Sequence, residues 1–283
     1  MLSQDILQDC GIAVTRHEAV HGGDINKAYC LYGNGQKYFL KINNAERYSG
    51  MFEKEARGLQ ALAQNIHLTV PAVIKFGSLQ GEQYLLMEWI DTSPAKKDCW
   101  QNFGAALALL HKKPATYFGW IEDNFIGSVV QCNHQQTEWH LFYGECRILP
   151  LVKHLVDAGV FSKNDMIAAE AFCKRLEQLF PVEPPALLHG DLWSGNYMIT
   201  TSGYAAIFDP AVYCGHREMD IGMTKLFGGF APYFYNAYNE AYPLEKDWQQ
   251  RLPYTQLYPL LVHSLLFGGN YVATVKEIMG QFH

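Results

Sequence analysis

The sequence predicts an α+β protein with two lobes, and the order of its hydrophobic patterns is the main evidence. Residues 1–91 contain three strand patterns, one amphipathic helix and two more strand patterns, whereas residues 92–283 are dominated by long helical patterns. We therefore expect a five-stranded antiparallel sheet with one helix, followed by a mainly helical lobe. The composition changes after the segment DTSPAKKD, which places the expected boundary near 91–95.

Each element of the first lobe is predicted from local sequence. Apolar and β-branched residues in alternation indicate strands at 12–21, 27–33, 36–43, 72–79 and 82–90. Asn34-Gly35 and Gln80-Gly81 separate neighbouring strands, and an Asn-Gly pair is typical of a tight hairpin turn. A helix is expected at roughly 51–64, because apolar side chains recur there on one helical face.

The second lobe is predicted to be helical. Helical patterns cover 98–112, 138–158 and 162–180, and the second is expected to bend or break at Pro150. Ser162 and Asp165 have the spacing of a capping box, which marks the start of the third helix.

Composition restricts the class of protein. With 49% apolar and 18% charged residues, the 283-residue chain is an ordinary globular protein, and its net charge of −6 argues against a nucleic-acid partner. No apolar run is long enough to span a membrane, and the first residues lack the pattern of a signal peptide. Seven scattered cysteines without a C-x-x-C pair are typical of reduced thiols. We expect a cytoplasmic protein; its oligomeric state stays open.

The segment HGDLWSGN carries the strongest chemical signal. It has the H-x-D-x-x-x-x-N spacing of a kinase catalytic loop, in which Asp191 would accept the proton of a substrate hydroxyl and Asn196 would bind a metal ion. A carboxylate that binds the metal ions is needed in addition, and Asp209 supplies it at the end of the short apolar strand in AAIFDP. The alternative interpretation is a polar turn between a helix and a strand, which would not require a carboxylate at Asp209.

The first lobe contains candidate phosphate ligands. Gly22, Gly23 and Asn26 belong to the turn HGGDIN, where backbone N–H groups could approach an anion; a plain hairpin turn is the alternative. Lys41 on the third strand could contact the α- and β-phosphates of a nucleotide and pair with Glu55 on the following helix. The alternative interpretation is that Lys41 is a solvent-exposed lysine on a strand.

The segment LLMEWI at the end of the fifth strand is the expected link between the lobes. There an adenine ring would form hydrogen bonds with the Glu88 carbonyl and the Ile90 N–H, and Met87 would line the back of the pocket. An edge strand that enters a linker is the simpler interpretation, and both can hold together.

Two departures from protein kinases indicate a small-molecule kinase: Pro210 follows the metal-binding Asp209, and Trp193 stands where protein kinases carry a lysine. The segments LLHGDLWSGN, IFDPAVYCGHREMDIGMTKLFGGF, FGWIEDNFIGSVVQ and GGDIN resemble the fructosamine-3-kinase (ketosamine-3-kinase) family. The resemblance covers nearly the whole chain.

This resemblance implies a protein-kinase-like fold, with ATP and Mg²⁺ as cofactors. It implies substrates that are ketosamines, namely fructosamine or ribulosamine adducts of amines or protein lysines, phosphorylated on the sugar 3-hydroxyl. The product is unstable, so the family is regarded as deglycating. By position, Asp191 resembles the family's catalytic base, Asn196 and Asp209 its metal ligands, and Lys41 and Glu55 its phosphate-orienting pair.

Further residues are substrate candidates. Trp193 could stack on a sugar face or pack the loop against the second lobe, and His216 and Arg217 could contact substrate or the catalytic loop. Asp220 resembles an acidic anchor of the catalytic loop, or is simply a carboxylate at a helix N-terminus. Two other functions stay open: a kinase of another small hydroxylated amine, of the aminoglycoside or choline type, and a non-catalytic nucleotide-binding module.

Overall fold

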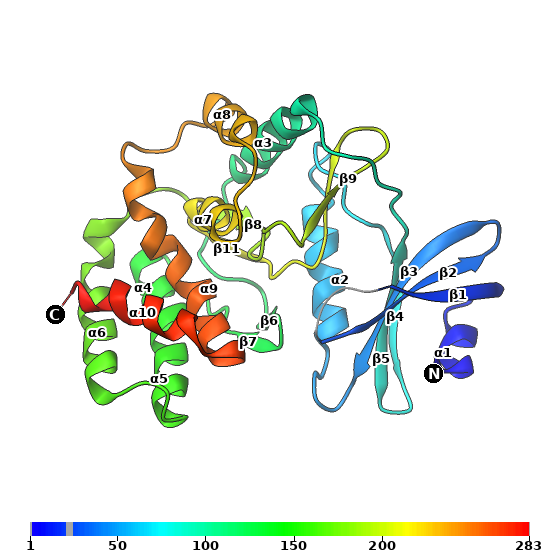
Figure 1. The fold of residues 1–283 in the computed structure, drawn as a ribbon, viewed down its shortest axis with the longest axis horizontal. Helices are drawn as coiled ribbons and strands as arrows, with labels where there is room; N and C mark the ends of the chain where they lie inside the picture. Colours follow the sequence, from blue (N-terminus) through cyan, green and yellow to red (C-terminus); the bar gives the residue numbers. More distant parts are fainter. Residues whose placement is uncertain (1, 21–24, 283) are drawn as a thin grey trace.

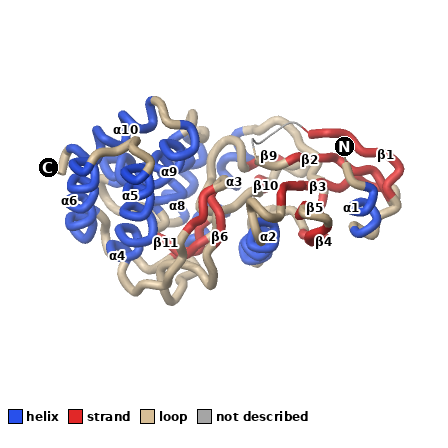
Figure 2. The backbone as a smooth tube through the Cα atoms, turned by 90° about the horizontal axis from the view of Figure 1, so that it is seen from below, coloured by secondary structure: helices blue, strands red, loops and turns tan. Residues whose placement is uncertain are grey.

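The computed structural model describes residues 2–20 and 25–282. The five-stranded sheet lies at one end of the molecule and most of the helices lie at the other, and a single connection, residues 89–96, leads from the sheet to the helical part (Figures 1 and 2). Within the described residues, no helix has the length and apolar character needed to cross a bilayer.

The described part of the first lobe is a five-stranded antiparallel sheet in the order β1-β2-β3-β5-β4. Asn34 and Gly35 at the β2–β3 turn have φ values of 51° and 78°, as a tight hairpin requires, and Gln80 and Gly81 repeat this at the β4–β5 turn. The predicted strands are confirmed with small changes at their ends. The elements are α1 (Gln4–Asp9), β1 (Val14–Val20), β2 (Lys27–Gly33), β3 (Gln36–Asn44), α2 (Met51–Leu62), β4 (Val73–Leu79) and β5 (Glu82–Glu88).

The two faces of this sheet are covered by different helices. Leu40 and Ile42 of β3 point to the face on which α1 packs. Phe39 and Lys41 alternate with them and point to the other face, where Phe52 of α2 packs against the sheet. Strand alternation therefore directs the Lys41 side chain towards helix α2.

The second lobe combines helices with short two-stranded ladders, β6–β7, β8–β11 and β9–β10. Ser162 and Asp165 form the predicted capping box. The elements are α3 (Lys97–His111), β6 (Asn124–Ile126), β7 (Val129–Gln131), α4 (Trp139–Tyr143), a π-helical turn (Gly144–Ile148), α5 (Leu149–Asp157), α6 (Lys163–Leu179), β8 (Ala186–Leu188), β9 (Tyr197–Ile199), β10 (Ala205–Ile207), β11 (Tyr213–Gly215), α7 (Glu218–Leu226), α8 (Pro232–Ala241), a 3₁₀ turn (Trp248–Arg251), α9 (Leu252–Phe267) and α10 (Asn270–Gly280).

The break expected at Pro150 takes the form of a widened helical turn just before it. Pro150 has no N–H, so the carbonyl of Cys146, four residues earlier, cannot receive the usual helical hydrogen bond. The π-helical turn Gly144–Ile148 lies at this point, and the Arg147 guanidinium donates to the Cys146 carbonyl instead (3.2 Å). The helical pattern therefore continues across the proline with its direction changed.

Two short segments tie the lobes together by backbone hydrogen bonds. In the connection, the Ser93 N–H donates to the Ile199 carbonyl at the end of β9 (2.8 Å). Between α2 and β4, the Thr69 N–H donates to Ala205 (3.1 Å) and its carbonyl accepts from Ile207 (3.0 Å). Both attachment points in the second lobe belong to the β9–β10 hairpin.

Candidate active site

A cleft of about 470 Å³ lies between the lobes and collects the predicted catalytic residues. Its walls come from the sheet and α2 on one side, and from the β6–β7 hairpin, the catalytic loop and helix α9 on the other. Figure 2 shows α2 and β6 facing each other between the lobes. The predicted residues that line the cleft are Asn26, Lys41, Glu55, Asp191, Trp193, Asn196 and Asp209.

Lys41 connects the two lobes inside this cleft. Its ammonium donates to both carboxylate oxygens of Glu55 (2.8 and 2.9 Å) and to Asp209 Oδ1 (3.0 Å). Burial alone lowers the pKa of Lys41, but the carboxylates of Asp209 and Glu55 outweigh burial and hold the pKa above its usual value. Lys41 is therefore a fixed positive charge, placed by β3 and α2 as the sequence predicts.

Asp209 and Asn196 offer oxygen atoms to a hard divalent cation. Asp209 sits at a backbone φ of +54°, and its side chain is 42% exposed towards the cleft. Asn196 is buried and uses its Nδ2 group to donate to the Asp191 carbonyl and carboxylate (2.8 and 3.0 Å). Its amide oxygen accepts no hydrogen bond from the described residues. A carboxylate and a free amide oxygen fit Mg²⁺, which prefers oxygen ligands.

Asp191 lies at the floor of the cleft, and its carboxylate Oδ2 accepts from Asn196. Burial raises the pKa of Asp191 to about 7; the Asn196 hydrogen bond opposes this effect, and the carboxylates of Asp209 and Asp220 add to it. A carboxylate with a pKa near neutral pH is suited to accept a proton from a hydroxyl group.

Asp220 at the start of α7 holds the catalytic loop, as its position suggested. Its two carboxylate oxygens accept the backbone N–H groups of His189 (2.8 Å) and Gly190 (2.9 Å). Gly190 has a φ of +82°, and a Cβ there would lie 2.0 Å from the Ala211 carbonyl oxygen. Only glycine therefore allows the loop to approach the segment that follows Asp209 so closely.

A second cavity of about 290 Å³ opens at the connection between the lobes. It contains the three residues predicted to contact an adenine ring, Met87, Glu88 and Ile90, together with Phe39 from the sheet. Asp209 lines this cavity as well as the main cleft. A ligand in the second cavity can therefore extend towards Lys41 and Asp209.

An aromatic wall borders the cleft beside the catalytic loop. Trp193 lies edge-on to Phe227, with ring centroids 5.6 Å apart, and the Phe227 ring is 4.9 Å from that of His263 on α9. His263 Nδ1 donates to the Pro259 carbonyl (2.8 Å), and burial lowers the His263 pKa. The ring is therefore neutral, with Nε2 as an acceptor. Sequence reasoning missed His263, because no motif links α9 to the catalytic loop.

The prediction that His216 and Arg217 could contact substrate is wrong, because neither side chain lines the cleft. His216 is fully buried, with Nε2 near the Pro181 carbonyl (3.3 Å). The Arg217 guanidinium makes a bidentate ion pair with Glu183 (2.7 and 2.8 Å) and stacks on the Tyr242 ring. Both side chains stabilise the second lobe and are not exposed to substrate.

The remaining predicted ligands belong to the glycine turn. Gly22 and Gly23 lie outside the described residues. Asn26 lines the cleft, and its Oδ1 accepts a hydrogen bond from Asn43 (2.9 Å).

The fold belongs to the protein-kinase-like class, in which a nucleotide-binding sheet lobe faces a helical catalytic lobe. An aminoglycoside phosphotransferase, APH(4)-Ia, has the same fold, with a TM-score of 0.67 over 99% of both chains at 14% identity. The crystal structure of a "putative fructosamine-3-kinase" from Haemophilus somnus 129PT is more similar, with a TM-score of 0.87 at 30% identity, covering 98% of this chain and 95% of that one.

Sequence comparison assigns the family. The fructosamine kinase family profile matches residues 2–283. A "probable ketoamine kinase" of Synechocystis sp. is 39% identical over 287 residues, covering 99% of this chain and 95% of the relative. The chloroplastic protein-ribulosamine 3-kinase of Oryza sativa subsp. japonica is 34% identical over 278 residues, covering 95% and 79%. The chain therefore belongs to the fructosamine kinase family.

Proposed function

We propose that this protein is an ATP- and Mg²⁺-dependent kinase that phosphorylates the sugar 3-hydroxyl of ketosamines, the fructosamine or ribulosamine adducts of amines or protein lysines. The observation that carries the proposal is the convergence of Asp191, Asn196, Asp209 and the Lys41–Glu55 pair in one cleft of a fructosamine kinase family member. Relatives named ketoamine kinase and protein-ribulosamine 3-kinase support the substrate class.

The nucleotide is expected to span both cavities. Its adenine ring occupies the cavity beside Met87, Glu88 and Ile90, and its phosphates extend to Lys41 and Asp209. Lys41 neutralises phosphate charge and is itself held in place by Glu55. Mg²⁺, when bound, supplies charge neutralisation on the β- and γ-phosphates, and Asn196 and Asp209 are the residues that would hold it.

Asp191 performs the proton transfer in this proposal. Its carboxylate accepts the proton of the sugar hydroxyl as the hydroxyl oxygen bonds to the γ-phosphorus, and the bond from that phosphorus to the β–γ bridging oxygen breaks so that ADP leaves. Asn196 Nδ2 fixes the carboxylate's orientation. Asp220 keeps the loop in position through the backbone N–H groups of His189 and Gly190. Preorganisation of this kind avoids the cost of reorienting groups during the reaction.

The aromatic wall is the proposed sugar site. Trp193 and His263 border the cleft next to Asp191 and present a ring face and a neutral ring nitrogen. A ring face suits the C–H side of a carbohydrate, and His263 Nε2 can accept a hydrogen bond from a hydroxyl or ammonium group. A sugar bound there would lie in the same cleft as Asp191, where we propose that its 3-hydroxyl reacts.

Mass spectrometry tests the proposal. Ribulose-lysine, fructose-lysine and an aminoglycoside are incubated separately with the protein, ATP and Mg²⁺, in parallel with the Asp191→Asn variant. We expect a phosphoryl mass gain on a ketosamine that the variant does not produce. Phosphorylation of the aminoglycoside alone would indicate a different small-molecule kinase. ATP binding without any transfer would instead indicate a non-catalytic module.

A further inference from the structure

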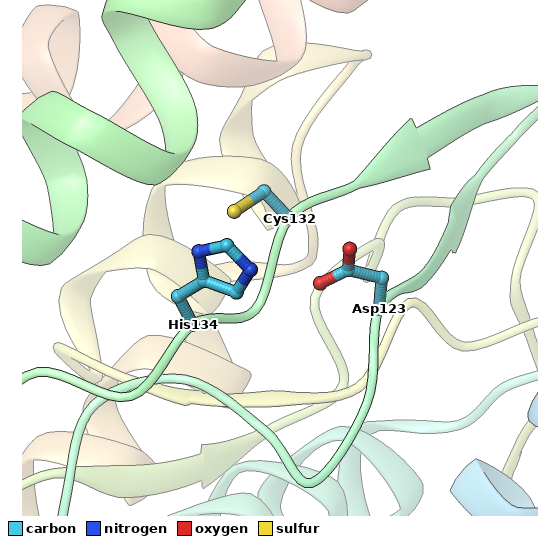
Figure 3. Close-up of side chains that lie close together, drawn as sticks. All are labelled: Asp123, Cys132 and His134. Atoms are coloured by element: carbon cyan, nitrogen blue, oxygen red, sulfur yellow. The ribbon is translucent and has the colours of Figure 1, made fainter.

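The base of the β6–β7 hairpin carries three side chains with metal-binding chemistry outside the cleft. Asn124 of β6 pairs with Gln131 of β7, so the next pair along the hairpin is Asp123 opposite Cys132. Side chains alternate along an extended chain, so His134 lies on the same side as Cys132. The three side chains converge from two neighbouring segments (Figure 3), and their ligand atoms lie within 4.8 Å of one another.

We propose that Asp123, Cys132 and His134 form a binding site for a zinc-class divalent metal ion. A thiolate, an imidazole and a carboxylate are the ligand types that Zn²⁺ combines, and a thiol disfavours Mg²⁺. Ligand atoms around a tetrahedral zinc ion are about 3.5 Å apart. The three ligand atoms must therefore approach one another by about 1 Å, and His134, which is exposed, is the side chain expected to move.

The backbone that presents these ligands is held on both sides. The Asn133 N–H donates to Asp123 Oδ1 (2.7 Å), which orients the carboxylate. The buried Arg147 guanidinium donates to the Cys132 carbonyl, and the Trp120 N–H donates to the Asn133 carbonyl (3.0 Å). The ligands therefore need little backbone rearrangement to bind a metal ion. In known metal sites, too, groups hydrogen-bonded to the ligands hold them in position.

The Asp123 carboxylate is a negative charge that a divalent cation can use, while the Lys54 ammonium and the Arg147 guanidinium bind the Asp123 and Cys132 carbonyls. Among the ion pairs of the described residues, none involves the Asp123 carboxylate. Together with a Cys132 thiolate and a neutral His134, it would balance the two positive charges of Zn²⁺. Three protein ligands would leave a fourth coordination position for a water molecule.

The hairpin connects this proposed site to the cleft. The Lys54 ammonium of α2 donates to the Asp123 carbonyl (2.5 Å). On the inner side, Asn124 Nδ2 donates to the carbonyl of Val212 (2.7 Å), three residues after Asp209. A metal ion at Asp123 therefore fixes a segment that supports both α2 and the chain that follows the metal-binding carboxylate of the cleft.

Zinc affinity and thermal stability test the site in the full-length protein after removal of metals with a chelator. Competition against a chromophoric chelator is expected to reveal Zn²⁺ binding that His134→Ala weakens by at least about tenfold. Zn²⁺ is expected to raise the melting temperature of the wild type but not of this variant. His154→Ala removes another exposed histidine, on α5, and serves as the matched control. Equal zinc affinity in the wild type and His134→Ala would overturn the proposal.

Cobalt provides a readout specific for the thiol. Co²⁺ bound at the proposed site gives a thiolate charge-transfer absorption that Cys132→Ser abolishes and Cys173→Ser, at another half-buried cysteine, retains. Among the described residues no cysteine lines the cleft, so Co²⁺ bound there would not give this absorption. Bound Co²⁺ without a thiolate absorption, or an absorption that Cys132→Ser leaves unchanged, would contradict the proposal.

Discussion

Replacing Asp220 with asparagine tests whether one buried carboxylate holds the catalytic loop in place. Asp220 is 1% exposed and accepts two backbone N–H groups, from His189 (2.8 Å) and Gly190 (2.9 Å). Asparagine offers only one side-chain acceptor, so one of these buried N–H groups loses its partner and meets an NH₂ group instead.

The magnitude follows from these two contacts. A hydrogen bond to a charged group contributes about 1.5–3 kcal/mol, and a buried unsatisfied donor costs about 1–3 kcal/mol. We therefore expect Asp220→Asn to lower the free energy of unfolding by about 3 kcal/mol. A shift of the loop of about 1 Å would lower kcat/KM by about 100-fold.

Urea unfolding and steady-state kinetics measure the two effects. The control is Asp157→Asn, which removes a carboxylate that is 61% exposed and pairs with Lys153 on the surface. This variant is expected to change stability by less than about 0.5 kcal/mol. If Asp220→Asn matched the control in both stability and kcat/KM, the anchoring role of Asp220 would be refuted.

The effect of Asp220→Asn on the free energy of unfolding is also expected to depend on pH. Burial by itself raises the pKa of Asp220, but hydrogen bonds and charge from His111 and His189 lower it below its usual value. An acid with a lowered pKa stabilises the folded state above its unfolded pKa and loses this effect as the pH falls through its folded pKa. The stability difference between wild type and Asp220→Asn is therefore expected to persist at neutral pH and to shrink below pH 3.8, its usual value.

Three further predictions concern the cleft. Because Asp191 must be ionised to accept a proton and its pKa is about 7, kcat/KM is expected to fall about tenfold per pH unit below that value; a flat profile would contradict this role. Lys41→Met leaves the Glu55 carboxylate buried without its cation, so a lower melting temperature and a higher KM for ATP are expected, and unchanged values of both would exclude the ion pair's role. Gly190→Ala places a Cβ 2.0 Å from a backbone oxygen and is expected to cost about 2–3 kcal/mol in urea unfolding. Gly159→Ala, with a φ of +73° but open space, should cost only about 1 kcal/mol, and equal costs would show that the close contact is unimportant.

Much of the first lobe could be predicted from sequence, because a few neighbouring residues determine each of its strands and turns. The Asn34-Gly35 pair adopts positive φ values, and this requirement is readable from two residues. Lys41 and Glu55 were predicted to pair because a buried lysine needs a partner, and strand alternation directs Lys41 towards α2, which carries Glu55. The catalytic loop could be predicted from the sequence because its chemistry fixes the spacing between Asp191 and Asn196.

The errors concern residues whose environment is made by distant segments. Arg217 follows a conspicuous motif, but its partner Glu183 lies 34 residues earlier, and no local pattern indicates that pairing. His263 comes from helix α9 and reaches the cleft only because that helix packs beside the catalytic loop. The strands of the β6–β7 hairpin have three residues each, too few for their alternation to be recognised.

The two attachments between the lobes determine how the cleft can open. Thr69 of the first lobe and Ser93 of the connection both form backbone hydrogen bonds with the β9–β10 hairpin, whereas Lys41 and Lys54 cross the cleft through side-chain contacts only. A body fastened at two points can turn only about the line that joins them. Motion that preserves these hydrogen bonds is therefore a rotation about the line through Thr69 and Ser93. Its displacement is smallest beside the cavity at the connection and largest at the parts of the sheet farthest from the hairpin. Such motion would enlarge the outer cleft while the cavity beside Met87, Glu88 and Ile90 keeps its shape.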